Sequence, residues 1–277
     1  MSILITADEL ARELESDAPP IILDVRWRLD RRDGRPEYLA GHLPGARFVD
    51  LDAELAEHGD LTDGRHPLPS LERLQEAARS WGINDGDAVV VYDDLANQSA
   101  ARAWWLLSYA GIADVRLLDG ALAAWTRSGR EVEPGEVDAP RGDVVLDFGH
   151  LPTIDIAGAA SQPSHGTLLD ARAGERYRGE VEPVDPRAGH IPGAISAPTA
   201  ANVDADGHFL TVDDLRARFS SLGVEPDDVA VYCGSGVTAA HEIAALTIAG
   251  YRPALYAGSW SQWSNHPDRP VATGSQP

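Results

Sequence analysis

Residues 229–249 have the sequence VAVYCGSGVTAAHEIAALTIA. The segment begins with the apolar run Val229–Tyr232, which predicts a buried strand. A glycine-rich loop follows this strand, and small and apolar residues at helical spacing then predict a helix over Thr238–Ala249. A strand that leads through a short loop into a helix is the repeating unit of parallel α/β sheets, so this stretch predicts that fold class.

Four motifs occur twice in the same order, about 140 residues apart, which is far longer than the period of a solenoid repeat. The pairs are IILDVR (21–26) with TLLDAR (167–172), GHLPGA (41–46) with GHIPGA (189–194), VVVYD (89–93) with VAVYC (229–233), and LDGA (118–121) with YAGS (256–259), the last pair followed by Trp125 and Trp263. This duplication predicts one domain at residues 1–132 and a second at residues 151–277. Residues 133–150 are rich in proline, glycine and charge, which predicts a linker.

Each half alternates predicted strands with predicted helices. This order indicates two tandem α/β domains, each with a mostly parallel sheet flanked by helices. The predicted strands are Ile21–Val25, Ala88–Tyr92, Val115–Leu118, Leu168–Asp170, Val229–Tyr232 and Ala254–Tyr256, and the predicted helices are Leu71–Trp81, Ser99–Ala110, Ala121–Ser128, Leu215–Leu222 and Thr238–Ala249.

The composition excludes several classes of protein. Among the 277 residues, 43% are hydrophobic and 24% are charged, which is typical of a globular protein. The 23 basic residues, all arginine, and 44 acidic residues give a net charge of −21, which argues against nonspecific binding to nucleic acid or an acidic membrane. Because the sequence shows neither a long apolar span nor a secretory signal, we expect a cytoplasmic protein with no membrane partner.

The chain has a single cysteine, Cys233, at the carboxyl end of a predicted strand. A lone cysteine excludes an internal disulfide and a multi-cysteine zinc site. No spacing of His, Asp or Glu indicates a metal site and no glycine pattern indicates a nucleotide site, so we expect neither a metal nor a cofactor.

The residues around Cys233 favour a reactive thiol. Parallel sheets bind ligands at the carboxyl ends of their strands. Gly234 and Gly236 allow the backbone to curl so that its N–H groups point inward, and the helix that follows adds its positive end. This field favours thiolate over thiol, which makes Cys233 a candidate nucleophile. The alternative is a small buried apolar residue.

The first repeat carries Asp93 where the second carries Cys233. A carboxylate cannot perform thiol chemistry, so we expect the first domain to be catalytically degenerate and the second to hold the active cysteine.

Taken together, these motifs resemble those of tandem-domain rhodanese-like sulfurtransferases. The resemblance covers nearly the whole chain and rests on the two DxR, GH(I/L)PGA and G(S/A)xxxW sets and on the loop cysteine of the second half. The loop Cys233–Thr238 is similar to the CG(S/T)GV(T) loop of 3-mercaptopyruvate sulfurtransferases. Thiosulfate-preferring relatives usually carry two basic residues after the cysteine, where this chain has Gly234 and Ser235.

The resemblance implies a sulfurtransferase in which Cys233 takes sulfur from a small anionic donor, 3-mercaptopyruvate, as a persulfide and passes it to an acceptor. The acceptor would be cyanide, a small thiol or a thioredoxin-like protein. The loop residues Gly234, Gly236, Val237 and Thr238 would hold the anion through their backbone. By the same resemblance, Arg172 and Arg176 would bind the donor's carboxylate, although Asp170 and Arg172 could instead form a structural pair, as Asp24 and Arg26 would.

In mercaptopyruvate-type relatives a first-half histidine and an upstream aspartate are associated with the serine of the cysteine loop. Carried over, these residues are His42, Asp33 and Ser235, and the set would relay a proton to the departing pyruvate enolate. The alternative for His42 is a structural role shared with His190, since both lie in the repeated GHxPGA turn. The segment 66–69, HPLP, is also similar to a family segment and is predicted to be a pocket rim, a domain interface or a plain loop.

Three alternative functions are weighed. Thiosulfate could be the donor in the same mechanism, or the domains could carry sulfur or sense oxidation without turnover. A cysteine phosphatase would need an arginine six positions after the cysteine, where this chain has Ala239, so that activity is disfavoured.

Overall fold

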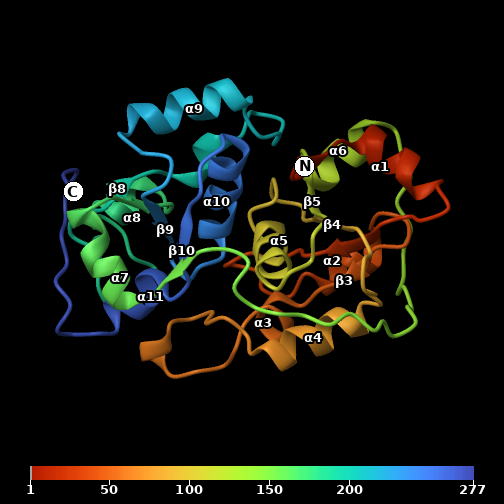
Figure 1. Cartoon of the computed structure of the whole chain (residues 1–277), viewed down its shortest axis with the longest axis horizontal. Coiled ribbons are helices and arrows are strands. Elements are labelled where there is room, and N and C mark those ends of the chain that lie inside the picture. Colours follow the sequence, from red (N-terminus) through yellow and green to blue (C-terminus); the bar gives the residue numbers. More distant parts are fainter. Residues whose placement is uncertain (1) are drawn as a thin grey trace. The chain divides into compact units, whose positions relative to one another are not determined.

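The apolar runs of the two repeats form the central strands of two parallel sheets, one in each half of the chain (Figure 1). The computed structural model describes residues 2–277. The first sheet has the strand order β1-β5-β4-β2-β3 and the second has the equivalent order β6-β10-β9-β7-β8. The pairs in both sheets are parallel. The strands are β1 (Leu4–Ile5), β2 (Ile21–Asp24), β3 (Arg47–Phe48), β4 (Val89–Tyr92), β5 (Val115–Leu118), β6 (Thr153–Ile154), β7 (Thr167–Asp170), β8 (Ile195–Ser196), β9 (Val229–Tyr232) and β10 (Ala254–Tyr256).

Helices connect these strands and cover the sheets, as a parallel arrangement requires. In Figure 1, α5 lies against β4 and β5, and α10 lies against β9 and β10. The α-helices are α1 (Ala7–Leu14), α2 (Arg35–Ala40), α3 (Leu51–Glu54), α4 (Leu71–Ser80), α5 (Ala100–Tyr109), α6 (Ala121–Arg127), α7 (Ile156–Ser161), α8 (Gly174–Tyr177), α9 (Val212–Ser221), α10 (Thr238–Ile248) and α11 (Ser259–Ser264), and the 3-10 turns are η1 (Leu61–Asp63), η2 (Gln162–Ser164) and η3 (Thr199–Asn202). The α/β class predicted from the sequence is confirmed.

Successive side chains of the central strands point to opposite faces of the sheet, and both sets are buried. All four residues of β4 and of β9 are buried. In β9, Ala230 and Tyr232 belong to a core cluster that also contains Trp260 and Trp263 of α11. The equivalent cluster of the first sheet contains Val90, Tyr92 and Trp125.

Contacts divide the chain into two units whose boundaries differ from those expected. Unit 1 comprises Met1–Glu57, Pro69–Leu151 and Val203–Phe209, and unit 2 comprises His58–Leu68, Pro152–Asn202 and Leu210–Pro277. Each repeat therefore contributes a short segment to the other unit. Residues 58–68 belong to unit 2 because they bond to it, for example through the Arg65 amide, which donates to Ser261 Oγ at 3.0 Å.

Residues 133–150, predicted to be a linker, pack along unit 1. Val144 and Leu146 are buried. The Gly142 amide donates to the Arg79 carbonyl at 2.8 Å, and a Cβ at Gly142 would come within 2.0 Å of the Ile83 carbonyl oxygen. Only glycine allows this approach, so the segment is an ordered part of the unit.

Candidate active site

The cysteine loop connects β9 to α10, at the carboxyl end of the sheet of unit 2. The Gly236 amide donates to Cys233 Sγ at 3.1 Å, and Gly236 has a positive φ of 79°, which glycine adopts without strain. Cys233 is only 1% exposed. The loop therefore turns at least one backbone N–H toward the sulfur, as the sequence predicts.

The start of α11 supports this loop from the side. The Cys233 amide donates to Ser259 Oγ at 3.1 Å, and the Cys233 and Gly234 carbonyls accept from the Trp260 and Ser261 amides at 3.0 and 2.8 Å. Ser259 has φ 53°, an uncommon conformation for a side-chain-bearing residue. These bonds fix the backbone of Cys233, the candidate nucleophile, and the sequence gives no signal for the role of Ser259.

Unit 1 shows what the same turn does with a carboxyl group. The Asp93 carboxylate accepts from the amides of Leu95, Asn97, Ser99 and Ala100 at 2.7 to 3.1 Å. Burial raises the pKa of Asp93, whereas these four backbone hydrogen bonds oppose the rise. The strand–loop–helix turn of this fold is thus an anion-binding turn, filled in unit 1 by the chain's own carboxylate.

Ser235 has a histidine partner within unit 2. His66 Nδ1 and Ser235 Oγ are 2.7 Å apart, and both residues are buried. The hydroxyl of the loop residue two positions after Cys233 is therefore coupled to an imidazole. Such a pair can hold or move a proton beside the nucleophile.

His42, which was expected to be this histidine, makes its hydrogen-bond contacts within unit 1. It is fully buried in unit 1, where Nδ1 lies 2.9 Å from the Leu43 carbonyl and Nε2 lies 3.1 Å from the Gly135 carbonyl. Its ring stacks on Tyr38 at 4.2 Å, and His190 stacks on Tyr177 in the same way. The pattern shared by both repeats agrees with the structural role that was the alternative for His42.

The contact that the structure gives for Asp33 is a local one within unit 1. Asp33 is exposed, and its carboxylate accepts from the Arg35 amide at 3.0 Å, at the start of α2. This is the position of a helix-start residue, because a short acidic side chain satisfies an amide there. The histidine that contacts Ser235 is His66 of the HPLP segment, and the similarity of that segment to a family segment was the signal available in the sequence.

Arg172 occupies a structural position. Its guanidinium is 2.6 Å from the Asp170 carboxylate, donates to the Gly189 carbonyl at 2.7 Å and lies 4.6 Å from the Trp260 ring centroid. Arg26 repeats the bonds to an aspartate and a glycine carbonyl in unit 1. Burial lowers the pKa of Arg172, but Asp170 outweighs it, so the net shift is upward and the charge is retained. The repeated pair connects the strand to the GHxPGA turn, which is the structural alternative to donor binding expected for Asp170 and Arg172.

Arg176 lies beside the cysteine loop. It pairs with Glu182 at 2.7 Å and with Asp185 at 3.4 Å. A Cβ at Gly234 would lie 3.4 Å from Arg176 Nη1 and 3.3 Å from Arg65 Nη2, so two guanidinium groups approach the loop next to the nucleophile. Arg65, like His66, comes from the segment of the first repeat that belongs to unit 2, and sequence reasoning missed it.

The remaining predicted loop residues, Val237 and Thr238, connect the cysteine loop to α10. Val237 is buried, and Thr238 begins α10. Both therefore continue the turn from the cysteine into the helix, where their amides belong to the positive helix end.

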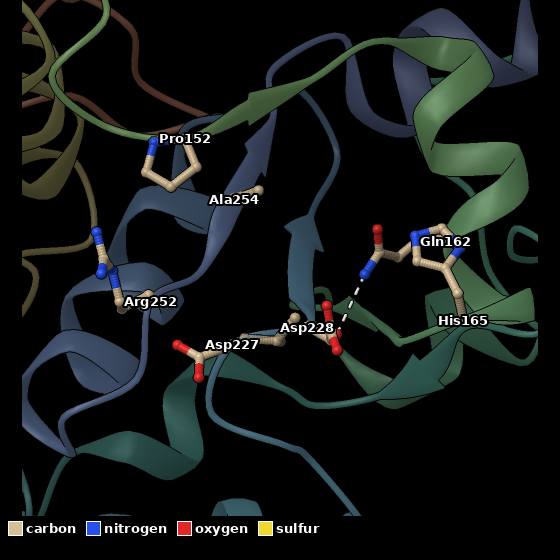
Figure 2. Close-up of a pocket in the computed structure, with 8 residues that line it drawn as sticks. Pro152, Gln162, His165, Asp227, Asp228, Arg252 and Ala254 are labelled. Atoms are coloured by element: carbon tan, nitrogen blue, oxygen red, sulfur yellow. Dashed lines mark hydrogen bonds between the residues drawn. The ribbon is translucent and has the colours of Figure 1, made fainter.

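A separate cavity of about 310 Å³ opens at the other end of the same sheet, where β9 and β10 begin (Figure 2). Gln162 donates there to the Asp228 carbonyl at 3.1 Å, and Asp227, Arg252 and His165 surround the opening. Its place at the amino ends of the strands separates it from the cysteine loop.

Within residues 2–277, no group of three or more His, Cys, Asp or Glu side chains is arranged to hold a metal ion. Over the same residues, no helix combines the length and apolar character needed to cross a membrane.

Comparisons with known proteins agree with this geometry. A family model described as the rhodanese-like domain matches residues 6–128 and 156–266. The SseB protein of Mycobacterium tuberculosis, named as a thiosulfate sulfurtransferase, is 50% identical over 99% of this chain and 98% of its own length. A protein of Pseudomonas aeruginosa, named as a 3-mercaptopyruvate sulfurtransferase, is 46% identical over 98% of both chains.

A solved structure gives the same relationship in three dimensions. The crystal structure of SseA from Escherichia coli, a 3-mercaptopyruvate sulfurtransferase, superimposes with a TM-score of 0.83 at 34% identity. The match covers 94% of this chain and 99% of that one.

Proposed function

Because this chain belongs to the rhodanese-like family and is a tandem-domain sulfurtransferase, we propose that 3-mercaptopyruvate is its donor and that Cys233 carries the transferred sulfur. The observation that supports this choice of donor most directly is the buried Ser235–His66 pair beside the nucleophile. Sulfur transfer from thiosulfate releases sulfite, which needs no proton at carbon. Sulfur transfer from 3-mercaptopyruvate releases the enolate of pyruvate, which must take up a proton at carbon.

In the proposed step, the Cys233 thiolate attacks the sulfur of the donor and forms an S–S bond. The C–S bond breaks and its electron pair goes to the donor's carbon skeleton, which becomes the pyruvate enolate. A proton supplied through Ser235 and His66 converts the enolate to pyruvate. The enzyme keeps the sulfur as a persulfide, and the Gly236 amide stabilises charge at the sulfur.

The persulfide then passes its outer sulfur to an acceptor. We propose that the acceptor is a small thiol or a thioredoxin-like protein, with cyanide as a laboratory substitute. A reducing compartment supplies such thiols, so the proposal keeps the cytoplasmic location expected from the sequence.

The positions of Arg176 and Gly234 also support a donor that carries a carboxylate. The loop has no cationic side chain of its own, and Gly234 leaves space for guanidinium groups that approach from the side. Arg176 can bind a carboxylate with two parallel N–H bonds.

Steady-state kinetics with both donors test the proposal. We expect pyruvate release from 3-mercaptopyruvate, with a thiol acceptor, at a kcat/KM well above that for thiosulfate-to-cyanide transfer. His66→Ala should lower kcat with 3-mercaptopyruvate far more than with thiosulfate, because only the first reaction needs the proton.

A matched control is His165→Ala, since His165 lies at the separate cavity at the other end of the sheet. A preference for thiosulfate, which the name of the Mycobacterium relative favours, would contradict the proposed donor. Equal losses with both donors in His66→Ala would contradict the proton relay.

A further inference from the structure

We propose that Arg65 and Arg176 form a two-arginine clamp for the donor's carboxylate, and that Asp185 occupies this clamp until the donor binds. The inference rests on the proposed function and deepens it, because it assigns donor specificity to Arg65, a residue that the first repeat supplies to unit 2.

The two guanidinium groups already share one carboxylate. Arg65 Nη1 is 2.6 Å from Asp185 Oδ1, and Arg176 Nη2 is 3.4 Å from Asp185 Oδ2. Each oxygen of the carboxylate thus faces a different arginine. A donor carboxylate has the same shape and charge and can take over both contacts.

The clamp lies next to the nucleophile. The nitrogens Arg65 Nη2 and Arg176 Nη1 come within 3.3 and 3.4 Å of the point where a Cβ of Gly234 would be. Gly234 directly follows Cys233. A small donor whose carboxylate is held beside Gly234 can therefore also place its sulfur at Cys233. The lack of a side chain at Gly234 leaves room for both guanidinium groups beside the loop.

A cavity beside Arg65 and Asp185 has room for a small acid. It has a volume of about 360 Å³ and is lined by Gly64, Arg65, Asp185, Pro186, Ser261 and Asn265, among others. Ser261 also donates its amide to the Gly234 carbonyl at 2.8 Å, so the wall of the cavity is continuous with the cysteine loop.

The charged groups of the clamp favour replacement of the Asp185 carboxylate by the carboxylate of a donor. Arg65 Nε is buried and has no hydrogen-bond partner among residues 2–277, so this guanidinium retains an unused N–H. Burial raises the pKa of Asp185, with Arg65 acting in the opposite direction, which indicates that the buried carboxylate is costly to keep ionised. Glu182 pairs with Arg176 at 2.7 Å and remains in place to orient it.

The test uses the full-length enzyme and compares KM for 3-mercaptopyruvate in three variants. Arg65→Gln should raise KM about tenfold or more with little change in kcat, because a charge-assisted contact to the bound donor is lost before and during the reaction. Asp185→Asn should lower KM several-fold, because the internal competitor loses its charge. Arg178→Gln, which removes an exposed arginine paired with Glu180, should leave both constants unchanged.

Pyruvate provides a second readout, because it keeps the carboxylate and lacks the sulfur. Its inhibition constant should move in parallel with KM in each variant. If Arg65→Gln does not fold, as judged by circular dichroism, Arg65→Lys is the second variant. Lysine keeps the charge but lacks the two parallel N–H donors of the guanidinium, so the rise in KM should be smaller.

An unchanged KM in a folded Arg65 variant, or a raised KM in Asp185→Asn, would overturn the clamp. These results are distinct from failure of the proposed function, which would appear as absence of turnover of 3-mercaptopyruvate by the unmodified enzyme.

Discussion

At the scale of single residues, the two repeats differ most clearly at the position after the fourth strand in sequence order. The Asp93 carboxylate accepts hydrogen bonds from four backbone amides of its own turn. Cys233 Sγ accepts one from the Gly236 amide, and the Cys233 backbone is hydrogen-bonded to α11. The same turn therefore directs backbone amides at a carboxyl group in unit 1 and at a cysteine sulfur in unit 2.

Ser259 offers a prediction at this scale, because its hydroxyl accepts from the Cys233 amide and donates to the Tyr256 carbonyl at 2.9 Å. Ala121 has the same positive φ at the equivalent position of unit 1, so the backbone tolerates alanine there. Ser259→Ala should fold, lose about 1 kcal/mol of unfolding free energy and slow both turnover and alkylation of Cys233.

Urea unfolding and the rate of reaction with iodoacetamide measure these effects. Ser161→Ala is the matched control, because Ser161 bonds only a nearby helix carbonyl in the same unit. An alkylation rate equal to that of the unmodified protein would refute a positioning role for Ser259.

At the scale of elements, α10 carries a buried ionisable group close behind the cysteine loop. Glu242 is fully buried, accepts from Asn202 Nδ2 at 2.6 Å and lies 3.8 Å from Arg218 of α9. Burial raises the pKa of Glu242 from 4.5 to about 7, and Arg218 only partly offsets this effect. Its protonation therefore changes near neutral pH.

The sign of the resulting pH dependence follows from linkage. The raised pKa favours the protonated folded state, so this contribution to stability is fully present below about pH 4.5 and is lost as the pH rises through about 7. Glu242→Gln stays neutral, so its unfolding free energy relative to the unmodified protein should increase by roughly 1–3 kcal/mol between about pH 5 and about pH 8. Urea unfolding at both pH values measures this difference, and a pH-independent difference would contradict the assignment.

The longer elements were predictable and the shortest were not. Runs such as Val89–Tyr92 and Val229–Tyr232 are fully apolar and bounded by turn residues, and both are strands as predicted. The edge strands β1, β3, β6 and β8 contain two residues each. Two residues show no periodicity, so their pairing depends on the neighbouring strand and cannot be predicted from local sequence.

At the scale of the whole molecule, the exchange of segments explains which site residues the sequence could identify. Cys233 and Ser235 lie in a local motif, so their place beside each other followed from the chain order. Arg65 and His66 belong to the first repeat by sequence but to unit 2 by contact. Long-range packing of this kind leaves no periodic signal, so chain order alone gives no indication that Arg65 and His66 contact residues of unit 2.

The net charge of −21 limits how such a molecule can bind an anion. Its site must rely on backbone amides and a few placed arginines, since the overall field repels anionic donors. The Asp93 turn uses backbone amides, and Arg65 and Arg176 use their guanidinium groups. Each set binds one of the protein's own carboxyl groups, Asp93 and Asp185 respectively.

The most direct test of the account is a single turnover with 3-mercaptopyruvate in the absence of an acceptor, followed by peptide mass spectrometry. We predict one pyruvate released per chain and a mass increase of one sulfur atom on the peptide that contains Cys233, the only cysteine in the sequence. Cys233→Ser should release no pyruvate. Pyruvate release without sulfur on Cys233, or by the serine variant, would contradict the central claim that this residue carries the transferred sulfur.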